Sequence, residues 1–171
     1  MLNISPDNYK TNNIFLEQEL LPIIKDLKKQ GKKIGLCTGS FDLLHPGHLT
    51  HFEDAKKFCD ILIVAIALDN FSENKYPGSG RPIFSHDLRA YMISKLKPVD
   101  YVTFEDGTPR IIEFLKPDVY IKGGDYSNEK DPGIVKGREI VEKYGGKIIF
   151  THTEKLSTSE IIKHIKEKIN F

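Results

Sequence analysis

The chain has 171 residues and a mass of 19.5 kDa, which is the length of one ordinary domain. Hydrophobic residues make up 39% of the sequence and charged residues 29%, enough for a buried core beneath a polar surface. Because 25 basic residues stand against 24 acidic ones, the formal net charge is +1. This balance argues against a general nucleic-acid binder and against a polyacidic protein.

The sequence also lacks the features of a membrane or secreted protein. The longest apolar run, Ile61 to Leu68, is far short of the ~20 residues that a membrane-spanning helix needs. The N-terminal stretch MLNISPDNYKTNN has neither the basic start nor the apolar segment of a secretory signal. Cys37 and Cys59 fall within apolar segments without a CxxC spacing, which favours two buried, reduced thiols over a disulfide. We therefore expect a cytoplasmic protein.

Hydrophobic periodicity predicts an alternation of helices and strands after a polar N-terminal arm. A leading helix is expected from Phe15 to Lys29, restarting at Pro22 and ending at Gly31. Strands are predicted at residues 33–38, 60–68, 100–104, 118–122 and 147–151. Further helices are predicted at residues 46–58, 85–96, 108–115, 133–144 and 157–169. Residues 69–84, rich in Asn, Ser, Gly and Pro, are expected to form a long loop.

This alternation predicts an α/β fold, in which right-handed crossovers join the strands into a parallel sheet. We expect one domain with about five strands and helices on both faces of the sheet. Ligands in such folds bind beyond the carboxyl ends of the strands, where the strand order reverses. The loops after the strands, residues 38–48, 69–84, 123–132 and 152–158, are therefore the expected location of the functional site.

The first of these loops, TGSFDLLHPGH, carries the strongest chemical signal. Gly39 allows a sharp turn off the strand, and Pro46 suits the first turn of the following helix. His45 and His48 are three residues apart and share one face of the helix start, and Gly47 between them leaves the approach open. Two imidazoles beside a helix N-terminus predict a polyphosphate pocket. The alternative interpretation is one capping histidine and one surface histidine.

The same segment resembles the signature of the cytidylyltransferase-like nucleotidyltransferases. The resemblance implies a Rossmann-like fold and transfer of a nucleoside monophosphate from a triphosphate to a phosphorylated acceptor, with release of pyrophosphate. It implies that His45 and His48 bind the triphosphate and stabilise the charge that develops during transfer. It also implies a set of nucleotide- or phosphate-binding residues around them, namely Thr38, Gly39, Ser40, Phe41 and Gly47.

A second motif of that superfamily, an (I/L)SST or STT sequence before the last helix, is matched by LSTS from Leu156 to Ser159. Hydroxyls and free N–H groups at a helix start bind phosphate well. The resemblance implies that Ser157 and Thr158 bind phosphate, with Thr158 also serving as the helix cap. Without the histidine motif, the same sequence would indicate only an N-cap.

Three further segments are similar to the adenylyltransferase domain of the bacterial ADP-heptose synthases. They are GRP at 80–82, EDGTP at 105–109 and VYIKGGDY at 119–126, and the order agrees from about Gly31 to Ile165. The similarity implies a stand-alone transferase domain over residues 31–171, preceded by an arm and leading helix over residues 1–30.

The sequence also departs from these families. Gly107 stands where the heptose enzymes more often run Glu-Asp-Thr-Pro directly, and the resemblance does not place the arm before residue 31. Glycerol-phosphate cytidylyltransferases carry RTEG before the last helix, whereas this chain has HTEK at 152–155, which weakens a cytidylyltransferase assignment.

The resemblance implies several additional site residues. Lys56 would contact phosphate as a third catalytic group, although it could equally be a solvated lysine on an amphipathic helix. Arg89 and Asp42 would face the substrate, although an exposed arginine and a turn-forming aspartate are the ordinary alternatives. The strand ending in KGGD would bring backbone close to the base and ribose through Lys122, Gly123, Gly124 and Asp125; otherwise the glycines form a simple turn.

We therefore expect an adenylyltransferase that joins ATP to a sugar 1-phosphate, with a heptose 1-phosphate as the favoured acceptor. Mg²⁺ is expected to arrive with the triphosphate, because no residue cluster has the spacing of a protein metal site. The nucleotide and the sugar phosphate are the expected partners, without nucleic acid or membrane, and a homodimer is compatible with the small size. The alternatives are a CTP-dependent enzyme that acts on glycerol 3-phosphate or a similar alcohol phosphate, and an inactive nucleotide-binding regulator.

Overall fold

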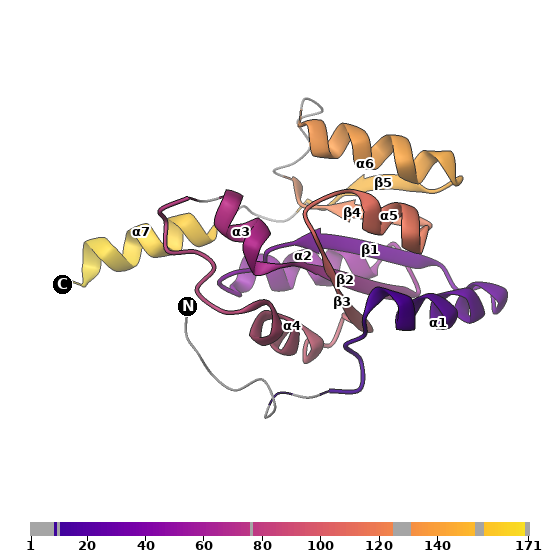
Figure 1. Cartoon of the computed structure of the whole chain (residues 1–171), viewed down its shortest axis with the longest axis horizontal. Helices are drawn as coiled ribbons and strands as arrows, with labels where there is room; N and C mark the ends of the chain where they lie inside the picture. Colours follow the sequence, from indigo (N-terminus) through magenta and orange to yellow (C-terminus); the bar gives the residue numbers. More distant parts are fainter. Residues whose placement is uncertain (1–8, 10, 76, 125–130, 153–155, 170–171) are drawn as a thin grey trace.

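The computed structural model describes residues 9, 11–75, 77–124, 131–152 and 156–169, which form a three-layer α/β arrangement (Figure 1). Five parallel strands form one sheet in the order β3-β2-β1-β4-β5. The strands are β1 (Ile34–Gly39), β2 (Ile61–Ala67), β3 (Tyr101–Glu105), β4 (Val119–Lys122) and β5 (Lys147–Phe150). The chain leaves β1 toward β2 and β3, then crosses back to β4 on the other side. The order therefore reverses between β1 and β4, at the centre of the sheet.

Helices cover both faces of the sheet, as expected from the sequence. They are α1 (Glu17–Lys29), α2 (Pro46–Lys56), α3 (Asp69–Lys75), α4 (His86–Ser94), α5 (Arg110–Leu115), α6 (Pro132–Lys143) and α7 (Thr158–Lys168). One hydrophobic cluster joins α2 and α4 to the sheet, and a second joins α1, α5 and α6 to the opposite face. Residues 62–67 of β2 are buried on both faces, which explains their unbroken apolar run.

The N-terminal segment belongs to the same core. The backbone of Asn13 and Phe15 is hydrogen-bonded to Val102 at the edge of β3, and Leu20 and Ile24 of α1 are buried. The expected restart of this helix at Pro22 was wrong, because α1 runs through that residue without a break. The ring of Pro22 is exposed in the second turn, so the helix loses one hydrogen bond and keeps its buried side.

The segment after β2 and the last helix agree only in part with their prediction. The predicted loop over residues 69–84 begins with the short helix α3, which directly follows β2. The predicted last helix forms as α7, but it extends beyond the body of the domain (Figure 1) and leaves Ile165 and Ile169 exposed. Cys37 and Cys59 are free thiols, as predicted, and burial raises the pKa of Cys59 to about 11.

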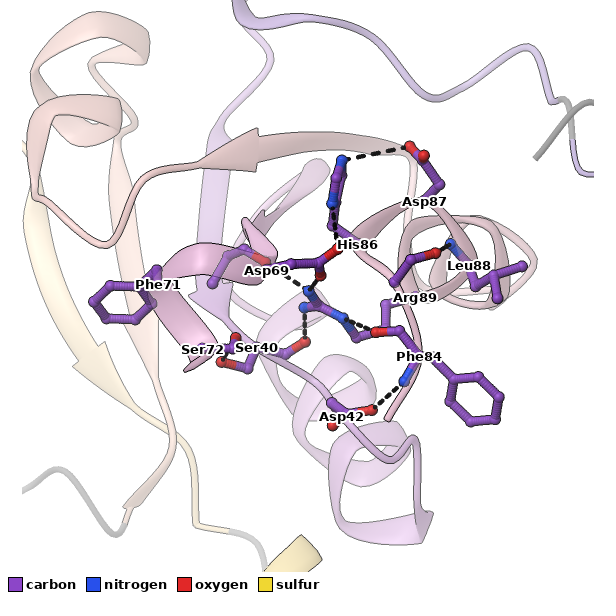
Figure 2. Close-up of polar contacts among 12 residues, drawn as sticks. Ser40, Asp42, Asp69, Phe71, Ser72, Phe84, His86, Asp87, Leu88 and Arg89 are labelled. Atoms are coloured by element: carbon purple, nitrogen blue, oxygen red, sulfur yellow. Dashed lines mark hydrogen bonds and ion pairs between the residues drawn. The ribbon is translucent and has the colours of Figure 1, made fainter. Parts of the chain in front are cut away.

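A buried arginine holds together the loops at the carboxyl end of the sheet (Figure 2). Arg89 lies on α4 with 0% of its surface exposed. Its guanidinium donates hydrogen bonds to the carbonyl oxygens of Ser40, Ala67 and Phe84, and it pairs with Asp69 at 2.7 Å. These groups belong to the loop after β1, the end of β2, the segment before α4 and the start of α3. One side chain thus positions four segments around the strand ends.

Asp42 makes a second connection between the same loops. Its buried carboxylate accepts hydrogen bonds from the backbone N–H groups of Ile83 and Phe84 at 2.8 and 3.1 Å. Arg81 donates to the carbonyl oxygen of Asp42 at 2.6 Å and also lies beside its carboxylate. The segment before α4 is therefore folded against the loop that follows β1.

Replacing Arg89 with methionine should lower the free energy of unfolding by about 3 kcal/mol, because the change leaves a carboxylate and three backbone carbonyls without their donor. Arg110→Met is the control, since the Arg110 side chain is half exposed and pairs with Glu17 and Asp106 at the surface. Its loss should be about 1 kcal/mol or less. Urea denaturation at pH 7 measures both values, and equal losses would contradict the structural role of Arg89.

Candidate active site

A cavity of about 390 Å³ opens at the carboxyl ends of the strands. Its walls come from the loop after β1, the starts of α2 and α7, the helix α3, and the ends of β3 and β4. It brings together most of the site residues expected from the sequence, which are Thr38, Gly39, Ser40, Phe41, Asp42, His45, Gly47, His48, Lys122, Gly123, Gly124, Ser157 and Thr158. Asp125 lies outside the described residues.

The end of β1 forms the floor of the cavity. The ammonium of Lys122 on β4 donates to the carbonyl and hydroxyl oxygens of Thr38 at 3.1 and 3.2 Å, and the Thr38 hydroxyl also contacts the Tyr120 hydroxyl at 3.0 Å. At Gly39, a Cβ atom would lie 3.0 Å from the ring of Phe41, so a larger residue would push that ring aside. The floor therefore connects the two strands between which the strand order reverses.

The two motif histidines stack at the start of α2. His45 occupies the N-cap position in extended conformation, Pro46 follows at the first helical position, and the imidazoles of His45 and His48 have centroids 3.7 Å apart at an interplanar angle of 22°. A Cβ atom at Gly47 would lie 3.1 Å from the His45 ring, which explains the glycine between them. In the part of the chain that the structure describes, neither buried Nδ1 atom has a hydrogen-bond partner.

Burial keeps this pair of rings uncharged. Burial lowers the pKa of His48 to about 3, and the repulsion that a protonated His48 would meet from protonated His45 and His51 and from Arg81 acts in the same direction. Burial also lowers the pKa of His45 below its ordinary value of 6.5. Both imidazoles are therefore neutral at pH 7. A buried polar atom without a partner is costly, which makes this pair of rings a candidate ligand site.

The remaining histidines outside the motif have packing partners or lie at the surface. His51 is buried on α2, with Nδ1 2.9 Å from the Thr151 hydroxyl. His86 pairs with Asp69, and His164 is exposed on α7.

The start of α7 closes another wall of the cavity. Ser157 is the N-cap: its hydroxyl accepts from the N–H of Glu160 at 3.2 Å, and the Glu160 carboxylate accepts from the N–H of Ser157 at 2.8 Å. The expectation that Thr158 is the cap was therefore wrong. Thr158 is the first residue inside the helix, and its buried hydroxyl donates to the carbonyl oxygen of Leu43 at 3.4 Å. It ties α7 to the loop after β1.

The structure does not bring Lys56 to the cavity. The Lys56 ammonium donates to the carbonyl oxygen of Asp60 at 2.6 Å and pairs with the carboxylate of Asp100, both beside the amino ends of β2 and β3. The physical reason is the direction of α2. It begins at the carboxyl ends of the strands and runs back along them, so two turns move a residue about 11 Å away from His48.

Arg89 and Asp42 also differ from their expected substrate-facing roles. The guanidinium of Arg89 is buried among backbone carbonyls and does not line the cavity. Asp42 lines it, but both of its carboxylate oxygens accept from the loop backbone. Gly124 also has a packing role, because a Cβ atom there would lie 2.6 Å from the carbonyl oxygen of Thr151.

The cavity includes several residues that the sequence analysis did not select. They include Arg81, Phe71, Tyr120 and Glu105, of which Glu105 is 7% exposed. Arg81 and Glu105 lie in segments whose similarity was recognised, and their charge in a loop after a strand was an available signal. Tyr120 also lies in such a segment, but it carries no charge, and Phe71 had neither signal; an aromatic residue near a strand end usually indicates core.

Within the described ranges, no group of three or more His, Cys, Asp or Glu side chains is placed to hold a metal ion. No helix in the same ranges combines the length and the apolar character that crossing a bilayer requires.

Comparisons with known proteins agree with this geometry. The cytidylyltransferase-like family model matches residues 36–164. The chain is 40% identical over 154 residues to the bifunctional protein HldE of Pseudomonas paraeruginosa, covering 88% of this chain and 31% of that protein. It is 41% identical over 149 residues to the protein of the same name from Geobacter metallireducens, covering 85% and 29%. The chain thus spans less than a third of the length of these relatives.

A solved structure shows the same fold. The lipopolysaccharide core biosynthesis protein from Thermoplasma volcanium superimposes with a TM-score of 0.60 at 29% identity, over 73% of this chain and all of that protein. The family match covers most of the strand-and-helix core and both the histidine motif and the start of α7. The chain therefore belongs to the cytidylyltransferase-like family of nucleotidyltransferases.

Proposed function

We propose that this protein is a cytoplasmic adenylyltransferase that transfers AMP from ATP to a sugar 1-phosphate, with a heptose 1-phosphate as the favoured acceptor. The products are pyrophosphate and a nucleotide sugar for cell-surface glycan synthesis. The observation that carries the proposal is the buried, stacked histidine pair at the start of α2, whose two Nδ1 atoms have no partner in the described chain. Such a pair fits the oxygens of a polyphosphate.

The reaction needs positioning and charge stabilisation more than acid or base catalysis. An oxygen of the acceptor phosphate, already ionised at neutral pH, attacks the α-phosphorus of ATP in line. The new P–O bond forms as the bond to the bridging oxygen of the β-phosphate breaks, and pyrophosphate leaves with that electron pair. No covalent enzyme intermediate is required. The protein holds the reactants in line and stabilises the charge that builds up on the phosphates.

The described residues can perform these tasks from three sides. The imidazoles of His45 and His48 face the phosphate chain, and the first N–H groups of α2 present the positive end of the helix dipole to it. The start of α7 adds backbone N–H groups and lies against the same cavity. Lys122 supplies a positive charge at the floor, where its ammonium is held by Thr38.

Mg²⁺ fits this site as part of the substrate. The carboxylates that line the cavity are few, and that of Asp42 is already occupied by backbone N–H groups. The oxygens that a magnesium ion prefers are therefore supplied mainly by the triphosphate and water. In this arrangement the ion neutralises part of the phosphate charge, and the protein residues orient the complex.

The nucleotide base is assigned from sequence similarity. The segments around Arg81 and Lys122 resemble the adenylyltransferase domain of the ADP-heptose synthases, and the relatives with about 40% identity are bifunctional HldE proteins. The same similarity and the name of the structural neighbour support a sugar acceptor. These comparisons support the proposal; turnover assays test it.

Pyrophosphate release by the wild-type protein should be fastest with ATP and a sugar 1-phosphate. The assay crosses the four nucleoside triphosphates with heptose 1-phosphate, mannose 1-phosphate and glycerol 3-phosphate. Equal or faster turnover with CTP and glycerol 3-phosphate would replace the proposal with the cytidylyltransferase alternative. Nucleotide binding without turnover for any pair would favour the inactive regulator.

Replacing His48 with alanine should lower kcat by about 10²–10³, as for the loss of one preorganised donor to a developing charge. ATP binding should weaken much less, because the starts of α2 and α7 remain. The double variant with His45→Ala should lose less than the sum of the two single effects, since both rings act on one phosphate chain. His164→Ala, an exposed histidine on α7, is the matched control and should retain wild-type turnover. Near-normal turnover of His48→Ala would refute the assigned role.

The protonation of His48 should respond to a bound polyphosphate. In the free protein its pKa is about 3, so the ring stays neutral from about pH 5 to pH 8. Tripolyphosphate places negative charge beside the ring and favours the imidazolium, so the pKa should rise. Anion affinity should therefore increase as pH falls through the raised pKa. Imidazole ¹⁵N chemical shifts measure this, with His164 as the internal control. An anion that leaves the His48 titration unchanged would contradict the proposed contact.

A further inference from the structure

The carboxylate at the end of β3 has no role in the proposed phosphate transfer. Glu105 is the last residue of that strand, lines the cavity and is only 7% exposed. Burying an ionised carboxylate is costly unless something compensates for it. Burial raises the pKa of Glu105, although the Gly107 N–H and the charges of Lys122 and Lys75 oppose that shift. The strand therefore ends in a carboxylate whose burial costs free energy and which phosphate transfer does not require.

The turn after β3 fixes the orientation of this carboxylate. The N–H of Gly107 donates to one of the Glu105 carboxylate oxygens. Gly107 has a φ of +84°, and a Cβ atom there would lie 1.9 Å from the ring of Phe71. The turn therefore admits only glycine, because both the backbone conformation and the aromatic ring exclude a side chain. This explains the glycine that interrupts the Glu-Asp-Thr-Pro sequence.

Phe71 comes from α3 and lines the cavity beside this turn. Figure 2 shows its ring pointing away from the Arg89 network on the other side of α3. The helix is held in place from that side, by the Asp69–Arg89 pair and by the Ser72 hydroxyl at 2.9 Å from Ser40. An anchored aromatic ring and an oriented carboxylate thus form one wall of the cavity.

The chemistry of this wall indicates what it binds. An ionised carboxylate accepts hydrogen bonds and repels phosphate, so its partner carries hydroxyl or amino hydrogens. An aromatic ring beside it offers an apolar surface to C–H groups. A sugar ring has both kinds of group. In the sheet, β3 lies two strands from β1, so the ends of these two strands are about 10 Å apart. A sugar 1-phosphate whose phosphate lies near the histidines can therefore place its sugar ring against this wall.

We infer that Glu105 is the specificity-determining residue for the acceptor, with its carboxylate accepting a hydrogen bond from a ring hydroxyl of the sugar 1-phosphate beside Phe71. This inference rests on the proposed function, since it names how the acceptor of that reaction is recognised. It assigns the β3 side of the cavity to the sugar and leaves the β4 side, with Gly123 and Gly124, to the nucleoside.

The test compares wild type, Glu105→Gln and Asp106→Asn in pyrophosphate release, varying ATP and heptose 1-phosphate in turn. Glutamine keeps the shape and an oxygen for the Gly107 N–H but removes the charge. Asp106→Asn is the matched control, because it removes the same charge one residue away, on an exposed side chain that does not line the cavity. Glu105→Gln should raise the acceptor KM about ten-fold or more, as for loss of a hydrogen bond to a charged group, with the ATP KM within about two-fold. Asp106→Asn should change neither KM by more than about two-fold.

Monodeoxy analogues of the acceptor separate direct contact from a structural effect. In the wild type, the analogue that lacks the contacted hydroxyl should raise the KM by a similar factor. In Glu105→Gln the same analogue should cause little further loss, because the contact is already absent. Melting temperatures establish that each variant is folded. If Glu105→Gln does not fold, Glu105→Asp, which withdraws the carboxylate by one methylene and keeps its charge, takes its place.

The outcomes distinguish this inference from the proposed function. Wild-type turnover with an unchanged acceptor KM in the Glu105 variant overturns the inference alone. A raised ATP KM with an unchanged acceptor KM also overturns it, because the carboxylate then faces the nucleotide. A wild-type protein that uses no sugar 1-phosphate overturns the proposed function and this inference together.

Discussion

The cavity depends on the positive charge of Arg89, a buried side chain that does not itself line the cavity. Backbone carbonyls at and just beyond the carboxyl ends of β1 and β2 have no further strand to pair with, yet they are covered by loops and helices. Buried carbonyls need donors. Arg89 supplies them from α4, with the planar fork of a guanidinium reaching three carbonyls and the carboxylate of Asp69 at once. The loop after β1, the end of β2, the start of α3 and the segment before α4 keep their relative positions because they share this donor group.

A second constraint is electrostatic and acts inside the cavity. The histidine pair is buried enough to be neutral, which allows the two rings to stack at 3.7 Å without repulsion. The same burial leaves two ring nitrogens without partners in the described chain. The fold therefore carries a local cost at the place where an anionic ligand would relieve it. This arrangement is typical of binding sites, where polar groups are preorganised for a partner that the protein itself does not provide.

Much of the fold was predictable because its signals are local. The apolar run in β2 and the turn chemistry after β1 lie within short windows of sequence. The helix α3 was not predicted because it is short and its sequence, DNFSENK, is mostly polar. Contacts with residues distant in sequence hold it in place: Asp69 pairs with Arg89, and Ser72 contacts Ser40. Local propensity contains no trace of those contacts.

The site shows the same division. The spacing of His45 and His48 on one helix start, and their position after a strand and a glycine turn, followed from the sequence alone. The positions of Lys56 and Arg89 could not be predicted from the sequence. Lys56 depends on the direction in which α2 runs along the sheet, and Arg89 depends on the backbone carbonyls against which α4 packs.

The sequence by itself determined the α/β class, the alternating elements and the motif at the first strand end, since each depends on neighbouring residues. Only the tertiary structure decided the strand order and the convergence of Glu105 and Phe71 on one wall. Those relations arise when segments far apart in the chain meet at the end of a common sheet.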